Sequence, residues 1–257
     1  MILVTGATGT LGRPVVRLLR EAGADVHGLS RRDRDPEPGL TWHKGDLYTG
    51  EGVDAAVEGA ETIVHCASDP FHPKRDLPAS RRLVEAARRQ GAPHLVYISI
   101  VGVDKIDYGY YRTKHAVERH IEDSGLPYTI LRATQFHTLP AAVFNVLTKI
   151  PGVVGVPKGL RDQPVDVADV AARLAELALA AGPARRVDDM GGPEVLTVEE
   201  MLAGYMDARG LRRPVRVPLP LPGKAGRGFR AGHHLTPEHA VGKRTWRQFL
   251  AETHGPR

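Results

Sequence analysis

Short apolar runs alternate with amphipathic stretches through the first half of the chain. Short apolar runs between turn residues indicate buried strands, and apolar positions three or four residues apart indicate helices. The runs predict strands at 2–5, 25–30, 40–43, 62–66, 94–99 and 128–132, with helices near 10–22, 51–58, 76–90 and 110–125. Such alternation is typical of a parallel sheet covered on both faces. The pattern therefore predicts an α/β fold with a Rossmann-like, doubly wound parallel sheet.

The pattern changes beyond about residue 135. A helix is expected over 139–150, with one apolar face that packs in the core and in part lines a substrate pocket; this face holds Leu139, Val143, Val146, Leu147 and Ile150. Gly/Pro-rich turns at 151–164, a helix over 166–181 and an irregular extended segment at 211–235 are also expected. We expect a single domain, 1–257, in which 1–135 mainly binds a dinucleotide and 136–257 mainly forms a small substrate lobe.

Two further helix starts follow from side chains that can cap backbone groups. Thr197 and Glu200 stand three residues apart, as do Thr245 and Gln248. This spacing matches the capping box, in which each side chain bonds the other residue's backbone N–H. Asp166 and Asp169 begin the helix predicted at 166–181, and we expect them to act as caps rather than as acids.

Three glycines follow the first predicted strand and open the first predicted helix. They are Gly6, Gly9 and Gly12, spaced three residues apart. In this setting backbone N–H groups and a helix N-terminus face an anionic pyrophosphate. A side chain at Gly6 or Gly9 would obstruct the phosphates, and one at Gly12 would push the helix off the strand. The motif, with a strand arriving at 25–30, predicts dinucleotide binding.

Composition excludes several other classes of protein. The net charge of +5 is spread over arginine pairs along the chain, and aromatic residues make up only 5%, so no nucleic-acid partner is expected. No apolar run reaches about 18 residues, and no basic segment with an apolar stretch precedes the first strand, so neither a membrane span nor a signal peptide is expected. The single cysteine fits a cytoplasmic protein. None of the 12 histidines falls in a metal-binding pattern, and no metal site is expected.

A tyrosine and a lysine four residues apart supply candidate chemistry. Tyr110 and Lys114 share one face of a predicted helix, and Ser99 ends the strand before it. A nearby ammonium would lower the pKa of the phenol, which is ordinarily about 10. Tyr110 would then pass a proton to a developing alkoxide, Lys114 would hold the nicotinamide ribose, and Ser99 would hydrogen-bond the same oxygen.

Three segments that together span most of the chain carry a family resemblance. They are Gly6-Ala-Thr-Gly-Thr-Leu-Gly12, Tyr110-Tyr-Arg-Thr-Lys114 with the following strand to Arg132, and Asp166-Val-Ala-Asp169-Val. They resemble the atypical, NmrA-like branch of the short-chain dehydrogenase/reductase superfamily. The resemblance implies a Rossmann-like fold, NAD(P)H binding and a catalytic set of Ser99, Tyr110 and Lys114. It implies cofactor contacts from Gly6, Thr8, Gly9, Thr10, Leu11 and Gly12 (pyrophosphate), Asp46 and Leu47 (adenine), Cys66 and Ala67 (ribose), Lys114, and Ala133 and Phe136 (nicotinamide).

The resemblance also bears on the choice of cofactor. Arg31 matches the position after the second strand that favours the 2′-phosphate of NADP, where an acidic residue would favour NAD. NADP(H) is therefore expected over NAD(H), although Arg31 also fits a solvated charge pair with Arg32. Cys66 is expected to be a small buried residue rather than a nucleophile. Gln135 and His137 could orient a substrate carbonyl, but packing is favoured for His137.

These features predict an NADPH-dependent oxidoreductase that reduces a carbonyl, quinone or enone of a small apolar molecule. Two alternatives stay open. One is a non-catalytic regulator that senses NADP(H), because some relatives of this branch bind the cofactor without reducing anything. The other is an isomerase or cyclase that uses the cofactor without net redox change.

Overall fold

The computed structural model describes residues 1–149, 152–212 and 214–254, which form two compact units. The first unit comprises Met1–Ser99, Gly109–Arg132 and Val170–Asp188. The second comprises Ile100–Tyr108, Ala133–Asp169 and Asp189–Arg257. Among the described residues, no helix has both the length and the apolar character needed to cross a membrane.

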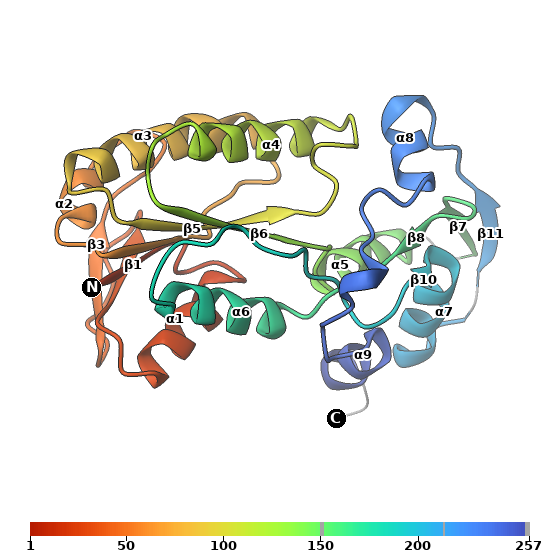
Figure 1. The fold of residues 1–257 in the computed structure, drawn as a ribbon. Coiled ribbons are helices and arrows are strands. Elements are labelled where there is room, and N and C mark those ends of the chain that lie inside the picture. The colour runs from red at the N-terminus through yellow and green to blue at the C-terminus, as the bar shows by residue number, and fades with distance from the viewer. Residues whose placement is uncertain (150–151, 213, 255–257) are drawn as a thin grey trace. The chain divides into compact units, whose positions relative to one another are not determined.

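A seven-stranded sheet forms the centre of the first unit (Figure 1). Its strands are β1 (Ile2–Thr5), β2 (Val26–Ser30), β3 (Leu40–Lys44), β4 (Thr62–His65), β5 (His94–Ile100), β6 (Tyr128–Ala133) and β9 (Arg185–Arg186). The order is β3-β2-β1-β4-β5-β6-β9, and the strand pairs with a described register are parallel. The first six strands follow the Rossmann order. The expected α/β fold is confirmed.

Helices cover both faces of this sheet, as expected for a doubly wound fold. They are α1 (Gly12–Glu21), α2 (Val53–Val57), α3 (Asp76–Arg89), α4 (Gly109–Glu122) and α6 (Val167–Leu179). Figure 1 shows α3 and α4 on one face and α1 and α6 on the other. Leu83 of α3 and Ile121 of α4 are fully buried in one core cluster with Ile63, Leu95 and Ile130 of the strands. The recurring apolar positions of each helix therefore face the sheet.

A buried ion pair joins α4 to β6. Arg132 donates to the carboxylate of Glu118 from Nε at 2.8 Å and from Nη2 at 2.6 Å. Both side chains are almost fully buried. Two parallel hydrogen bonds between a guanidinium and a carboxylate give a strong, directional contact.

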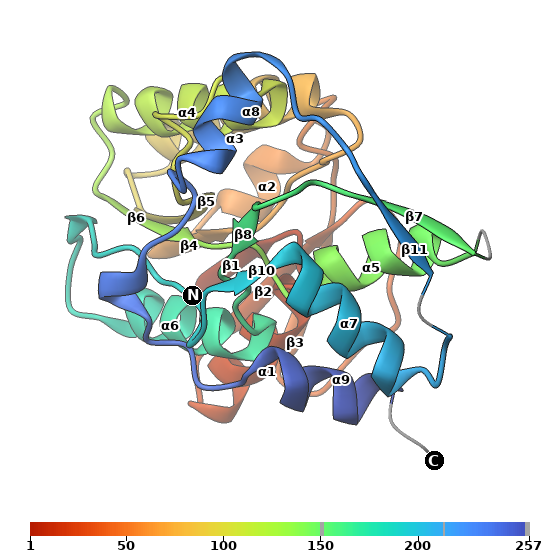
Figure 2. The ribbon, with the colours of Figure 1, turned by 90° about the vertical axis from the view of Figure 1, so that its right-hand side faces the viewer.

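The second unit is built from short strands and helices (Figure 2). They are α5 (Thr138–Leu147), β7 (Val153–Val156), β8 (Arg161–Asp162), β10 (Leu196–Thr197), α7 (Val198–Ala208), β11 (Val215–Pro218), α8 (Gly223–Arg230) and α9 (Trp246–His254). Phe144, Tyr205 and Trp246 are central to a core cluster shared by α5, β7, α7 and α9. The capping boxes expected at Thr197 and Thr245 are both present.

Three sequence expectations for this unit are wrong. The segment 211–235 is not irregular, because it contains β11 and α8, and the turns expected at 151–164 contain β7 and β8. The expected core face of α5 is largely exposed: Leu139 is 50%, Val143 46% and Val146 61% exposed. Ala141 and Phe144, on another face of α5, enter the core instead. Ile150 lies outside the described residues.

Replacing Arg132 with Met tests the buried ion pair. The Glu118 carboxylate would be left buried without its partner, so we expect the free energy of unfolding to fall by about 3–5 kcal/mol. Urea denaturation of the variant measures this loss. The double variant Arg132→Met with Glu118→Leu should recover much of it, since two apolar groups leave no unpaired charge. Equal losses in the single and double variants would contradict this account.

Candidate functional site

The glycine-rich loop connects β1 to α1 in a tight turn. Gly6 has a left-handed φ of +69°, and a Cβ there would lie 2.7 Å from the backbone nitrogen of Ala67. A Cβ on Gly12 would collide with the carbonyl oxygen of Gly6. Gly9 is exposed and donates its N–H to that carbonyl at 2.8 Å. Gly6 is thus required by backbone conformation and by packing against the loop after β4, whereas sequence analysis gave phosphate approach as its reason.

The start of α1 fits an anionic group. Its N-cap residue, Leu11, makes no side-chain cap, and its first turn contains no acidic residue. Thr8 is half-buried and Thr10 exposed, in the exposed part of the loop around Gly9. An uncapped helix N-terminus beside a glycine turn favours phosphate oxygens. These residues therefore fit the pyrophosphate of a dinucleotide.

Basic side chains gather after β2. Arg31 and Arg32 are exposed, and within the described chain their guanidiniums have no hydrogen-bond or ion-pair partner. Arg34 donates to Ser30 Oγ at 3.3 Å and lies 5.8 Å from the centre of the Trp42 ring. The nearby carboxylate of Asp33 is paired with Lys44 at 2.9 Å. The end of β2 thus offers free guanidinium groups to an anion.

Asp46 and Leu47 lie in the turn after β3. The Asp46 carboxylate accepts the N–H of Tyr48 at 2.7 Å. Leu47 is buried in the core cluster of the first unit. The Leu47 side chain therefore serves packing, and its expected adenine contact would have to use the backbone.

The loop after β4 brings His65, Cys66 and Ala67 beside the glycine turn. His65 bonds Thr5 Oγ1 through Nδ1 at 2.7 Å and stacks on Tyr97. Burial, together with the smaller effect of the Lys114 ammonium, lowers the pKa of His65 to about 3. Cys66 is half-buried rather than fully buried as expected. Desolvation still raises the pKa of its thiol to about 12, so the thiol stays protonated at neutral pH.

Lys114 lies under the carboxyl ends of the strands. Its side chain comes from α4, is 3% exposed, and donates to the carbonyl oxygen of Ile98 at 2.9 Å. The ammonium nitrogen sits 4.4 Å from the centre of the Tyr97 ring. Burial lowers the pKa of Lys114 to about 8, whereas the nearby carboxylates of Asp76 and Glu118 raise it. The ring face and the carbonyl hold the charge, and the lysine still has hydrogen-bond donors to offer a ligand.

Tyr110 differs from the sequence expectation. Its hydroxyl is bonded to Ser68 Oγ at 2.9 Å, and Ser68 Oγ donates to Asp76 Oδ2 at 2.5 Å. Burial raises the pKa of Tyr110 to about 12, the Ser68 hydrogen bond lowers it, and the charge of Asp76 raises it. We expected Lys114 to lower the pKa of Tyr110. This expectation is wrong, because burial and the carboxylates of Asp76 and Asp69 raise that pKa.

Ser99 ends the part of β5 that belongs to the first unit. Its side chain is 2% exposed, and its Oγ has no hydrogen-bond partner among the described residues. The structure therefore does not join Ser99 to Tyr110. A buried hydroxyl without a partner is costly, so this oxygen is suited to a bond with a bound molecule.

Sequence analysis missed Ser68 and Asp76. They lie more than thirty residues before Tyr110, and no spacing along the chain links them to it. The available signal was that Ser68 lies in the loop after β4 and Asp76 begins the helix that follows, because a parallel sheet carries this loop to the edge where ligands of such folds bind.

The remaining predicted residues belong to the second unit. Ala133 is buried and pairs with Met190, and Phe136 is half-buried and pairs with Val165. Their contact with the nicotinamide stays a prediction. His137 is buried and stacks on Phe249, with a ring centroid distance of 5.0 Å, which confirms packing for that residue.

Asp166 precedes α6, Asp169 lies in its first turn, and the two aspartates have separate roles. Asp166 caps α6 as expected by accepting the N–H of Ala168 at 2.8 Å. Asp169 instead accepts the N–H of Lys243 at 2.7 Å, so it fixes the segment before α9 rather than the helix end.

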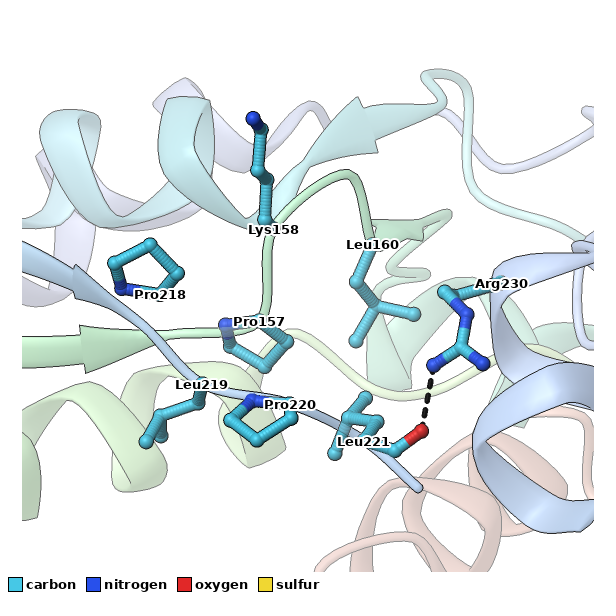
Figure 3. Close-up of a pocket in the computed structure, with 8 residues that line it drawn as sticks. All are labelled: Pro157, Lys158, Leu160, Pro218, Leu219, Pro220, Leu221 and Arg230. Atoms are coloured by element: carbon cyan, nitrogen blue, oxygen red, sulfur yellow. Dashed lines mark hydrogen bonds between the residues drawn. The ribbon is translucent and has the colours of Figure 1, made fainter. Parts of the chain in front are cut away.

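The second unit also contains an apolar pocket of about 310 Å³ (Figure 3). Its lining residues follow β7, end or follow β11, or end α8. They are Pro157, Lys158, Leu160, Pro218, Leu219, Pro220, Leu221 and Arg230. Arg230 donates to the carbonyl of Leu221 at 2.5 Å, and Lys158 points away from the other side chains. The pocket wall is therefore chiefly proline and leucine.

A Rossmann-like sheet with a glycine turn and a buried lysine at its strand ends defines a dinucleotide-binding α/β protein. The profile of a family described as NAD(P)H-binding matches residues 6–180. This match covers more than half of the chain, and the chain belongs to that NAD(P)H-binding family.

Individual relatives agree with this assignment. A (4-alkanoyl-5-oxo-2,5-dihydrofuran-3-yl)methyl phosphate reductase of Streptomyces griseus subsp. griseus is 33% identical over 230 residues, covering 84% of this chain and 76% of that protein. The chloroplastic protein High Chlorophyll Fluorescence Phenotype 244 of Arabidopsis thaliana is 31% identical over 233 residues, covering 84% of this chain and 58% of that protein. In fold, the chain matches the NADPH-dependent quinone oxidoreductase of Escherichia coli in complex with NADPH, with a TM-score of 0.82 and 21% identity over 98% of this chain and 99% of the other.

These similarities confirm the resemblance to the atypical short-chain dehydrogenase/reductases. The chain is an NAD(P)H-dependent oxidoreductase.

The environment of Lys114 predicts an unusual titration. With ε-¹³C-lysine NMR, we expect one resonance, absent in Lys114→Met, to titrate near pH 8, because burial disfavours the ammonium. Exposed Lys44 is the matched control, since its hydrogen bond to Asp33 raises its pKa above 10.5. A Lys114 midpoint at or above that of Lys44 would contradict the described burial.

Proposed function

We propose that this chain is an NADPH-dependent reductase whose substrate is a quinone, an enone or another carbonyl of a small, apolar molecule. The observation that carries the proposal is the buried Lys114 ammonium, held by Ile98 and Tyr97 at the carboxyl ends of the strands. A buried cation of this kind is suited to the hydroxyls of a cofactor ribose. Its neighbours Tyr110 and Ser99 offer hydroxyl groups to a substrate oxygen.

The proposed cofactor contacts follow the first unit from strand to strand. The glycine loop (Gly6, Thr8, Gly9, Thr10, Leu11 and Gly12) would hold the pyrophosphate on the uncapped start of α1. Arg31 would pair with the 2′-phosphate, Asp46 and the Leu47 backbone would contact adenine, and Cys66 and Ala67 would line the ribose. The free guanidinium of Arg31 supports NADP(H) over NAD(H).

The bound cofactor supplies hydride chemistry. The chain's own residues then have three tasks. Lys114 positions the ribose through donors that its bond to Ile98 leaves free. The unpartnered hydroxyl of Ser99 hydrogen-bonds the substrate oxygen as negative charge develops there. Tyr110 supplies the proton to that oxygen.

The substrate class rests on the chemistry shared by two relatives. The Streptomyces reductase is named for a 5-oxo-2,5-dihydrofuran that carries an alkanoyl group, in which a ring double bond is conjugated to carbonyls. The Escherichia coli relative is named for quinones, in which carbonyls are also conjugated to ring double bonds. Both kinds of molecule accept hydride at an electron-poor carbon while an oxygen takes up negative charge. A conjugated carbonyl compound is therefore the substrate class that we propose.

Arg31→Asp tests the cofactor preference. Losing a charge-assisted bond to the 2′-phosphate costs roughly 1.5–3 kcal/mol, so NADPH binding should weaken by about 10- to 100-fold, with little change for NADH. Calorimetric titration with both cofactors measures this. Arg17→Asp is the control, because Arg17 is an exposed residue of α1 that pairs with Glu21 away from the glycine loop. Equal weakening of NADPH and NADH would exclude the 2′-phosphate contact.

Turnover tests the reaction itself. NADPH oxidation is followed at 340 nm with menadione, with an alkanoyl butenolide and with a saturated ketone. We expect turnover of the conjugated acceptors and its loss in Lys114→Ala, with circular dichroism showing that the variant stays folded. Arg17→Ala, on the exposed surface of α1, should retain full activity. If no acceptor of the panel oxidises NADPH, or if Lys114→Ala is fully active, the proposal is wrong.

A further inference from the structure

A chain of hydrogen bonds runs from Tyr110 into the protein. The phenol oxygen of Tyr110 lies 2.9 Å from Ser68 Oγ, and Ser68 Oγ lies 2.5 Å from Asp76 Oδ2. The other carboxylate oxygen of Asp76 accepts the N–H of Asp69 at 2.9 Å. Asp76 is buried and is the first residue of α3, where the helix dipole stabilises negative charge.

The chemistry of these groups fixes the direction of each bond. An ionised carboxylate can only accept, so Ser68 donates its single hydroxyl proton to Asp76. Ser68 then has no proton for Tyr110, and the Tyr110 hydroxyl must donate to Ser68. With Asp76 ionised, the Tyr110 proton therefore points toward Ser68 and away from any molecule that approaches the phenol oxygen.

A proton on Asp76 reverses both bonds. The carboxylic acid then donates to Ser68, Ser68 donates to Tyr110, and the Tyr110 proton is free to point elsewhere. We propose that Asp76, acting through Ser68, sets the direction of the Tyr110 hydroxyl and supplies the proton that Tyr110 passes to the substrate oxygen. Asp76 and Ser68 are positioning residues here, and this step rests on the proposed function.

The proton transfer balances with the proposed reduction. The reduced nicotinamide cofactor loses a hydride with its electron pair and is oxidised, and the substrate carbon gains that hydride. The substrate oxygen takes the Tyr110 proton, Tyr110 takes the Ser68 proton, and Ser68 takes the Asp76 proton. Asp76 is left as a carboxylate and takes up a solvent proton, so the net reduction consumes one hydride and one proton from solution. Each hydroxyl gives one proton and receives one, so neither ends the cycle charged.

Charged and titratable groups around Asp76 come from three elements. Lys114 and Tyr110 reach it from α4, Tyr97 from β5, and Asp69 with its partner His72 from the loop after β4. The Asp76 carboxylate raises the pKa of Lys114, so each proton transfer at Asp76 changes the charge balance beside the lysine. The hydrogen-bond chain thus couples Lys114, which is expected to touch the cofactor, to Tyr110, which is expected to touch the substrate.

A purely structural role for Asp76 is the alternative, because its bond to Asp69 also fastens the loop. The variant Asp76→Asn distinguishes this structural role from the proposed proton relay. The amide oxygen can still accept from Asp69, and its NH₂ can donate to Ser68. The loop would stay fastened, but residue 76 could no longer give up or take a proton.

The first experiment needs neither cofactor nor turnover. In protein labelled with ¹³Cζ-tyrosine, the Tyr110 resonance is identified by its absence in Tyr110→Phe and titrated in each variant. We expect Asp76→Asn to lower the pKa of Tyr110, because a neighbouring negative charge is gone, and Ser68→Ala to raise it, because a stabilising hydrogen bond is gone. Asp54→Asn, on the exposed surface of α2, should change nothing. Unchanged titration in both relay variants would overturn the proposal.

The second experiment measures proton supply. With menadione and NADPH, kcat should fall by about 100-fold or more in Asp76→Asn, the usual scale of acid–base catalysis. The KM for menadione and the Kd of NADPH should stay near their wild-type values, because Asp76 touches neither molecule in the proposed arrangement. Asp76→Glu, which keeps a carboxyl group, should restore part of kcat.

The outcomes distinguish the two proposals. If the wild-type protein turns over menadione and Asp76→Asn keeps its kcat, the proton relay is wrong while the reductase stands. If the wild-type protein turns over no acceptor, the proposed function fails, and the tyrosine titration alone decides whether Asp76 and Ser68 control Tyr110.

Discussion

One buried positive charge organises the candidate site. The Lys114 ammonium is held between the Tyr97 ring and the Ile98 carbonyl, and its charge acts on the neighbouring His65 and Cys66. It lowers the pKa of His65 below the value that burial alone gives, and it opposes the rise of the Cys66 pKa. The carboxylates of Asp76 and Glu118 in turn favour the ammonium. Because Arg132 neutralises Glu118, Asp76 is the carboxylate near Lys114 whose charge is not already paired with a guanidinium.

The backbone of the site follows from local rules that sequence analysis can apply. Gly6 adopts a positive φ, and the Tyr110–Lys114 spacing places both side chains on one helix face, so the glycine turn and the lysine were both predicted. The partners of Tyr110 were not predicted, because Ser68 and Asp76 meet it only through the fold. Periodicity shows which residues share a helix face, but hydrogen-bond partners from other elements depend on tertiary packing.

In the second unit, the sequence pattern likewise could not predict which face of a helix is buried. α5 has apolar residues around most of its circumference, so its pattern alone cannot decide which of them face the core. Phe144 enters the core because Tyr205 and Trp246, from α7 and α9, pack around it. The short strands β7 and β11 were missed because their four-residue runs lie among prolines and glycines, which usually mark turns.

The state of Cys66 has a consequence for self-damage. Quinones and enones are electrophiles that form covalent adducts with thiolates. The chain has a single cysteine, and burial keeps its thiol protonated by raising its pKa to about 12. It lies directly beside Ala67, on which the glycine turn packs. For the conjugated carbonyl substrates proposed above, the chain therefore offers no readily ionised thiol, and alkylation is suppressed at the residue where an adduct would disrupt the glycine loop.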